Sequence, residues 1–201
     1  MAQTTVSPTL VKELRERTGA GFMDCKRALE ENDGDLDKAV TSLREKGLAA
    51  AAKKADRDAR EGLVSSYILA GGRLGVLIEV NCETDFVART EEFQKLVRDL
   101  AIQVAGLAPT YTTVDAIPAE AIEHKRAELL ADETTQKKPE AIRAQIVEGQ
   151  LKKWYQSVVL YEQPFRDTDQ TVAQLVTDAI ARIGENIRVR RFVRYALGEE
   201  M

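Results

Sequence analysis

The sequence predicts an α+β protein: a module of three short helices, then a core with a short antiparallel sheet of about three strands packed by helices. Two observations carry this prediction. Residues 7–46 place apolar side chains at helical spacing, interrupted twice by glycine-containing turns. From residue 63 the period changes, because the segments 63–69 and 74–82 are rich in Val, Ile and Leu and flank a Gly-Gly turn. That combination is typical of a β-hairpin.

The first three helices have recognisable ends. Ser7 can cap the first helix and Pro8 suits its first turn, where a missing N–H costs nothing. The segment 19–21 separates it from a second helix, residues 32–34 end that one, and the third is expected to stop at Gly47. The apolar sides carry Leu10, Val11, Leu14, Phe22, Cys25, Ala28, Leu29, Leu36, Ala39, Val40 and Leu43. Such a small core is marginal, and modules of this size usually present a surface rather than enclose an active site.

A change of composition marks the domain boundary. Residues 48–61 are alanine-rich and charged, which favours a solvated helical linker. We therefore expect a three-helix domain over residues 1–47, a linker over 48–61 and an α+β core, also the dimerisation domain, over 62–201.

The remaining elements follow from periodicity. The strand 74–82 has one apolar face, and an amphipathic helix follows from about residue 90 to 105, ended by Gly106. Two more helical stretches cover 119–131 and 139–155. Thr171 and Gln174 form a capping-box pattern that opens a helix ended by Gly184. The last segment, 187–197, is a strand candidate whose apolar face would include Arg191, for which the sequence offers no account. That face holds Ile187, Val189, Val193 and Tyr195.

Composition excludes several classes of site. One histidine among 201 residues rules out sites that need two imidazoles, and two distant cysteines argue against a disulfide scaffold and for a reducing compartment. The net charge of −4 supplies no global basic field for DNA. The start of the chain lacks the regions of a signal peptide, and no apolar run approaches the ~20 residues that span a bilayer. We expect a cytoplasmic protein without cofactor or metal. Nucleotide-binding glycine motifs are also missing, and His124 reads as a solvated surface residue.

Two charged clusters leave alternatives open. Glu79, Glu83 and Asp85 could hold Mg²⁺ or act as paired catalytic carboxylates, but a solvated strand end is favoured. Arginines between 188 and 194 could bind the phosphates of RNA, which would make the chain a nucleic-acid-binding or ribosome-associated factor; a solvated strand edge is favoured. Both cysteines are expected to be small buried hydrophobes.

Phe86 is the most informative single residue. The apolar face of the strand ends at Cys82, yet Phe86 and Val87 follow a run of polar residues. Phe86 either packs back under the next helix as a hydrophobic staple or is presented to a partner.

Four segments together resemble the bacterial elongation factor Ts family, the guanine-nucleotide exchange factors of elongation factor Tu. They are residues 10–26 (LVKELRERTGAGFMDCK), 79–88 (EVNCETDFVA), 147–154 (VEGQLKKW) and 183–191 (IGENIRVRR). They occur in the family's order and span nearly the whole chain.

The resemblance implies roles for two sets of residues. It makes the first module a ubiquitin-associated-like domain that touches the partner's GTPase domain through Phe22 and Met23, with Phe22 standing where a methionine is expected. The family's Thr-Asp-Phe-Val element falls on consecutive residues here, namely Thr84, Asp85, Phe86 and Val87.

In the mechanism that the resemblance implies, Asp85 and Phe86 reach the partner near its nucleotide pocket. Phe86 would wedge between two helices there, displace the Mg²⁺ site and loosen the phosphate loop, so that GDP leaves and GTP can bind. The chain itself would bind no nucleotide, DNA or membrane and would break no bond. An enzyme that uses the three acids of the hairpin exit is the weakest alternative.

The length predicts an oligomer. Longer members of the family carry two core subdomains and a coiled-coil insertion, whereas 201 residues leave room for one core subdomain, and no separate heptad stretch is found. By resemblance to short members we expect a homodimer, formed through the sheet edge.

Overall fold

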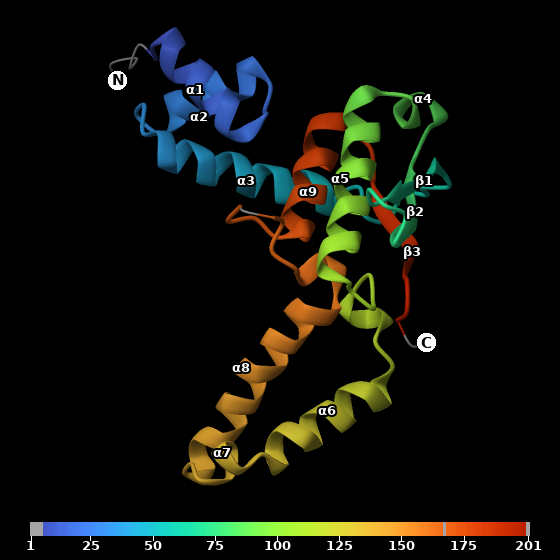
Figure 1. The fold of residues 1–201 in the computed structure, drawn as a ribbon. Helices are drawn as coiled ribbons and strands as arrows, with labels where there is room; N and C mark the ends of the chain where they lie inside the picture. Colours follow the sequence, from blue (N-terminus) through green and yellow to red (C-terminus); the bar gives the residue numbers. More distant parts are fainter. Residues whose placement is uncertain (1–5, 167, 200–201) are drawn as a thin grey trace. The chain divides into compact units, whose positions relative to one another are not determined.

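A computed structural model describes residues 6–166 and 168–199 (Figure 1). The chain divides into two compact units. The first unit contains the residues up to Gly62 together with Asn81–Phe93 and Val176–Arg188. The second unit contains Leu63–Val80, Gln94–Leu175 and the residues from Val189 onward. We keep as a proposal the domains expected from the sequence, with boundaries at residues 47 and 62, because the two compact units are built from segments that are not contiguous in sequence.

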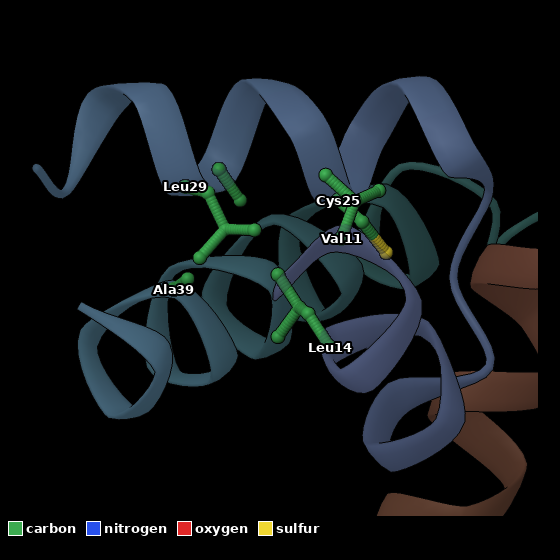
Figure 2. Close-up of a cluster of buried hydrophobic side chains, with 6 residues drawn as sticks. Val11, Leu14, Cys25, Leu29 and Ala39 are labelled. Carbon is green, nitrogen blue, oxygen red and sulfur yellow. The ribbon is translucent and has the colours of Figure 1, made fainter. Parts of the chain in front are cut away.

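The three N-terminal helices of the first unit are α1 (Pro8–Thr18), α2 (Phe22–Glu31) and α3 (Leu36–Ala52). The Ser7 hydroxyl accepts a hydrogen bond from the Leu10 amide, as the capping pattern predicts, and Gly19 ends α1 with a φ of 66°. The three helices enclose a cluster of buried side chains (Figure 2), formed by Val11, Leu14, Cys25, Ala28, Leu29 and Ala39. The three-helix prediction is confirmed, and its helices are consistent with a ubiquitin-associated-like domain.

Two helix ends were predicted wrongly from glycine. Helix α3 continues through Gly47 to Ala52, and Gly47 is buried. A Cβ at this position would lie 3.5 Å from the Cβ of Ala181, so the glycine lies inside a close helix contact rather than at a helix end. In the same way, α5 (Glu91–Leu107) runs past Gly106. The turn out of α5 is made by Ala108, whose φ is 44°.

The sheet contains β1 (Glu61–Ile68), β2 (Leu74–Cys82) and β3 (Arg188–Ala196), in the order β1-β2-β3. It is antiparallel, as predicted. One face of β2 is buried, and the apolar stripe of α5 is buried too. Within the second unit, the buried side chains of β2 are Val76, Ile78 and Val80, and those of α5 are Leu96, Val97, Leu100, Ala101 and Val104. Alternating side chains therefore give the sheet one buried face.

The predicted apolar face of β3 is wrong beyond Val189. Val189 is buried, whereas Val193 and Tyr195 are exposed. The alternation shifts at Arg190 and Arg191, and both guanidinium groups pair with the Glu79 carboxylate of β2, at 3.4 and 2.8 Å. These ion pairs supply the account of Arg191 that the sequence lacked.

Helices complete the chain. The second unit contains α6 (Ala119–Ala131), α7 (Glu133–Gln136) and α8 (Glu140–Val158), and α6 lies beside α8 with the short α7 at their joined ends (Figure 1). Two short 3-10 helices, Val114–Ala116 and Leu160–Glu162, flank this pair. Helix α9 (Val172–Ile183) begins with the predicted capping box, since the Thr171 amide donates to Gln174 and the Gln174 amide donates to the Thr171 hydroxyl. Gly184, at a φ of 88°, ends it. None of the helices in the described ranges is long and apolar enough to cross a membrane.

Candidate functional site

Phe86 is presented to solvent by a single helical turn in the first unit. This turn, α4 (Asp85–Ala88), follows β2 after two residues, Glu83 and Thr84. The Phe86 side chain is 76% exposed, whereas its neighbours Val87 and Ala88 are 7% and 5% exposed. The staple alternative is therefore wrong. The turn is anchored by the buried Val87 and Ala88, whereas Phe86 is exposed to solvent.

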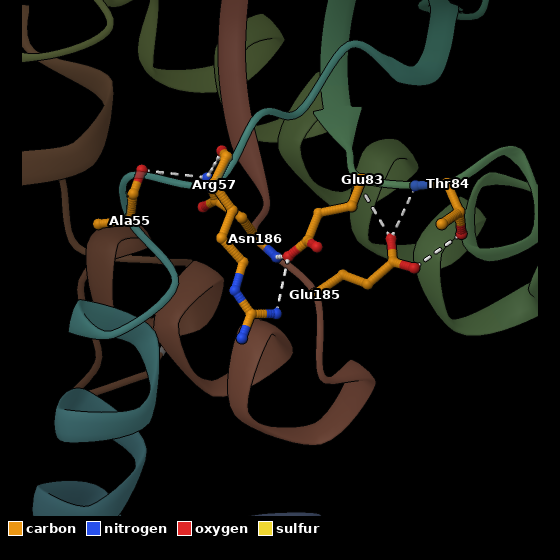
Figure 3. Close-up of polar contacts among 6 residues, drawn as sticks. All are labelled: Ala55, Arg57, Glu83, Thr84, Glu185 and Asn186. Carbon is orange, nitrogen blue, oxygen red and sulfur yellow. Dashed lines mark hydrogen bonds and ion pairs between the residues drawn. The ribbon is translucent and has the colours of Figure 1, made fainter.

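The turn is held by Thr84 and by a carboxylate from far along the chain. The Thr84 hydroxyl accepts a hydrogen bond from the Val87 amide and so caps α4. Glu185, just after α9, accepts from the Glu83 and Thr84 amides at 3.0 Å each and from the Thr84 hydroxyl at 2.7 Å (Figure 3). Hydrogen bonds to an ionised carboxylate are stronger than neutral ones.

A second set of contacts joins Glu83 and Asn186 to the segment that follows α3. The Glu83 carboxylate accepts from the Asn186 amide at 2.6 Å and pairs with Arg57 at 3.5 Å. The buried Asn186 side chain donates to the main-chain carbonyls of Ala55 and Arg57, at 3.2 and 2.8 Å (Figure 3). Residues 185–186 thus contact both the Phe86 turn and the segment that follows α3.

Both cysteines are buried thiols, as predicted. Burial raises the pKa of Cys25. Burial also raises the pKa of Cys82 to about 11, and the nearby charge of Glu185 adds to this shift. The Cys82 thiol is therefore protonated at neutral pH and can donate to the Thr84 carbonyl, 3.2 Å away.

The three acids near the hairpin exit have basic partners. Glu79 pairs with Arg190 and Arg191, Glu83 pairs with Arg57, and Asp85 pairs with Arg89 at 2.7 Å. Among residues 6–166 and 168–199, no group of three or more His, Cys, Asp or Glu side chains is arranged to hold a metal ion. The geometry favours ion pairing over the magnesium alternative.

The arginines of β3 are likewise engaged. Arg188 donates to the Ala59 carbonyl within the first unit. In the second unit Arg194 donates to both carboxylate oxygens of Glu199, at 2.9 and 2.6 Å, and Arg190 and Arg191 hold Glu79. These contacts give the arginines a structural role and weaken the RNA-binding alternative.

Phe22 and Met23 form the other predicted contact. They begin α2, after the N-cap Gly21, and are 50% and 60% exposed. Phe22 is therefore not part of the module's core, although its spacing placed it on the apolar side. The first turn of α2 therefore exposes two adjacent large apolar side chains.

Sequence reasoning missed Glu185, Asn186 and Arg57 as parts of this site. Each is an ordinary surface residue type, and more than 90 positions separate Glu83 from Glu185 in sequence. Two signals were available for Glu185 and Asn186: they form a polar pair directly after the glycine that ends a helix, and they lie within the family-like segment 183–191.

The fold and this site define an α+β protein with a helical N-terminal module and an exposed aromatic on a braced turn. Residues 29–199 match the family model described as Elongation factor TS. Elongation factor Ts of Heliobacterium modesticaldum is 55% identical over 195 residues, covering 96% of this chain and 91% of the relative. That of Carboxydothermus hydrogenoformans is also 55% identical, covering 96% and 90%. That of a Synechococcus species is 56% identical over 197 residues, covering 97% and 76%. The chain belongs to the elongation factor Ts family and is a translation elongation factor.

Proposed function

We propose that this chain promotes the release of GDP from elongation factor Tu, and that Phe86 is the group that opens the nucleotide pocket. Membership of the family supports the exchange role. The observation that carries the proposal is the exposure of Phe86 on a turn whose neighbouring side chains are buried. Thr84 caps the turn, Asp85 lies beside the ring in sequence, and Val87 anchors it.

The proposed mechanism is physical and makes or breaks no bond. GDP with Mg²⁺ is held in a GTPase by many charge-assisted contacts, so its release is slow. A ring that enters the pocket region and displaces the Mg²⁺ site binds better to the nucleotide-free partner. By linkage, it weakens nucleotide binding by the same factor by which the nucleotide weakens the ring's binding. The chain needs no nucleotide, cofactor, DNA or membrane of its own and acts in the cytoplasm.

A second contact provides affinity. We propose that Phe22 and Met23 dock on the GTPase domain of the same partner. Exposed aromatic and methionine side chains are enriched in protein interfaces, because they bury much apolar area and adapt to the opposing surface. The module would hold the partner while the Phe86 turn acts on its pocket.

The exchange proposal is tested by the release of a fluorescent GDP analogue from elongation factor Tu, followed by stopped flow. Adding the full chain with an excess of unlabelled GDP should raise the release rate by at least ~10-fold, which corresponds to a fall of about 1.4 kcal/mol in the activation free energy of release. A release rate that does not change at micromolar chain concentrations would contradict the proposal.

We further propose a homodimer that is formed through the outer face of the sheet, rather than through its edge. This face, within the second unit, exposes large apolar side chains on all three strands, namely Val64, Ile68, Leu77, Val193 and Tyr195. The Ile68 side chain lies over Gly75, where a Cβ would be only 2.9 Å from Ile68 Cδ1. An exposed apolar patch of this kind marks an interaction surface.

The dimer is tested by changing the central strand. Leu77→Glu should convert a dimer into a monomer at micromolar concentration, because a charge on the face would be desolvated in the interface. Light scattering gives the mass, and Leu130→Glu, at an exposed position of α6, is the matched control that should stay dimeric. A monomeric unmodified chain, or a Leu77→Glu variant that stays dimeric, would refute this proposal.

A further inference from the structure

We infer that Glu185 is a positioning residue for nucleotide exchange: its carboxylate holds the turn that presents Phe86. The inference rests on the proposed function, since it concerns how the same ring is aimed. Glu185 lies between α9 and β3, about a hundred residues from Phe86 in sequence. It contacts the turn through the main chain and the Thr84 hydroxyl, rather than through Phe86 itself.

The hydrogen bonds form a continuous path from Glu185 to the helical turn. The Thr84 hydroxyl donates to Glu185 Oε1 at 2.7 Å and accepts from the Val87 amide at 3.3 Å. A hydroxyl has one proton to donate, and the carboxylate, which can only accept, fixes where that proton goes. The hydroxyl lone pairs are then free to face the Val87 amide. The orientation of the cap is thus set by Glu185.

A four-residue turn depends on such support. A single helical turn fixes several backbone angles for very few hydrogen bonds, so it is unstable by itself. On one side, the buried side chains of Val87 and Ala88 anchor α4. On the other side, Glu185 accepts hydrogen bonds from the main-chain amides of Glu83 and Thr84, which precede α4. Without the second support the turn can rotate about its anchor, and Phe86, which is exposed, would not resist that rotation.

The neighbouring Asn186 extends the same support to the helical module. Its side chain holds the carbonyls of Ala55 and Arg57, in the segment that follows α3, and its amide holds the Glu83 carboxylate. All of these residues belong to the first unit. One dipeptide therefore holds both the residues before the Phe86 turn and the segment that follows α3 of the three-helix module.

The test compares Glu185→Gln with Glu92→Gln in the full chain. Glutamine keeps the size of Glu185, but its amide nitrogen cannot accept, so at least one of the three hydrogen bonds is lost. Glu92 pairs with Arg182 at 2.8 Å in the same unit and does not touch the turn, which makes it the matched control. We expect Glu185→Gln to slow the stimulated release of GDP about 10-fold and Glu92→Gln to change it less than about 2-fold.

A second readout separates positioning from general stability. Amide hydrogen exchange of Thr84 and Val87, measured by NMR, should become faster in Glu185→Gln, while the amide of Val80 in β2 should keep its protection. Thr84→Val removes the hydroxyl that donates to Glu185 and should reproduce the slow release. This variant keeps the inference testable even where Glu185→Gln unfolds.

The outcomes distinguish this inference from the proposed function. Where Phe86→Ala leaves release unchanged, the proposed function fails. If Phe86→Ala slows the release of GDP from elongation factor Tu, but Glu185→Gln and Thr84→Val stimulate it as well as the unmodified chain, the ring acts without this support. The positioning role is then overturned. Faster exchange spread over Val80 as well as the turn would also overturn it, because Glu185 would then serve the whole fold.

Discussion

Replacing Phe86 by alanine is expected to slow the stimulated release of GDP from elongation factor Tu by about 30-fold or more. The ring is exposed in the free chain, so its removal leaves no cavity. An aromatic side chain that fills a pocket of a partner commonly contributes at least ~2 kcal/mol, which corresponds to that factor. Stopped-flow release of a fluorescent GDP analogue measures it directly.

The same substitution should leave the fold intact. An exposed side chain outside caps and the core usually changes the free energy of unfolding by less than about 0.5 kcal/mol. Leu107→Ala, at an exposed apolar position at the end of α5, is the matched control. It should stimulate GDP release from elongation factor Tu as well as the unmodified chain does. Equal release rates for Phe86→Ala and the unmodified chain would remove the ring from the mechanism.

Replacing Leu14 by alanine is expected to unfold the three-helix module. Leu14 is fully buried at the centre of the cluster formed by α1, α2 and α3. Truncating a buried leucine costs about 2–5 kcal/mol. A module of this size has little stability in reserve. Amides of α1–α3 should therefore lose their protection from hydrogen exchange, while those of β2 keep theirs.

The functional effect of Leu14→Ala should differ from that of Phe86→Ala. If Phe22 and Met23 dock on the partner, loss of the module raises the chain concentration needed for half-maximal stimulation and leaves the maximal rate largely intact. Leu48→Ala, an exposed leucine of α3, serves as the control. Protected module amides in Leu14→Ala, or an unchanged half-maximal concentration once the module is unfolded, would contradict this account.

Local sequence signals predicted much of the fold because the contacts that they describe are local. The Ser7 cap and the Thr171–Gln174 capping box form between residues three apart. The Gly-Gly hairpin turn likewise joins neighbouring strands. The alternation of β2 predicted its buried face, since side chains along a strand point to opposite faces in turn.

The errors arose where distant contacts decide the local structure. Gly47 reads as a helix end, but it lies against Ala181, which only the folded chain brings near. The face of β3 changes at Arg190 and Arg191, where both side chains pair with Glu79 of another strand. A pattern of hydrophobicity along one segment carries no information about such partners.

The candidate site was predictable only in part, for the same reason. The break in polarity around Phe86 singled out the ring, and the resemblance gave it a role. Its exposure depends on how α4 is held, and Glu185, which holds the residues just before α4, lies about a hundred residues away in sequence. The exposed outer face of the sheet could not be predicted either, because the exposure of Val193 and Tyr195 depends on the shift in β3.

The central claim is that Phe86 and GDP compete energetically for the same partner, and a thermodynamic cycle tests it most directly. At one fixed free Mg²⁺ concentration, titrations give the affinity of the chain for elongation factor Tu with and without GDP, and the affinity of GDP for elongation factor Tu with and without the chain. The account predicts one coupling factor in both directions, roughly 5–150-fold, that falls toward one in Phe86→Ala. A Phe86→Ala variant that keeps the full coupling factor would contradict it.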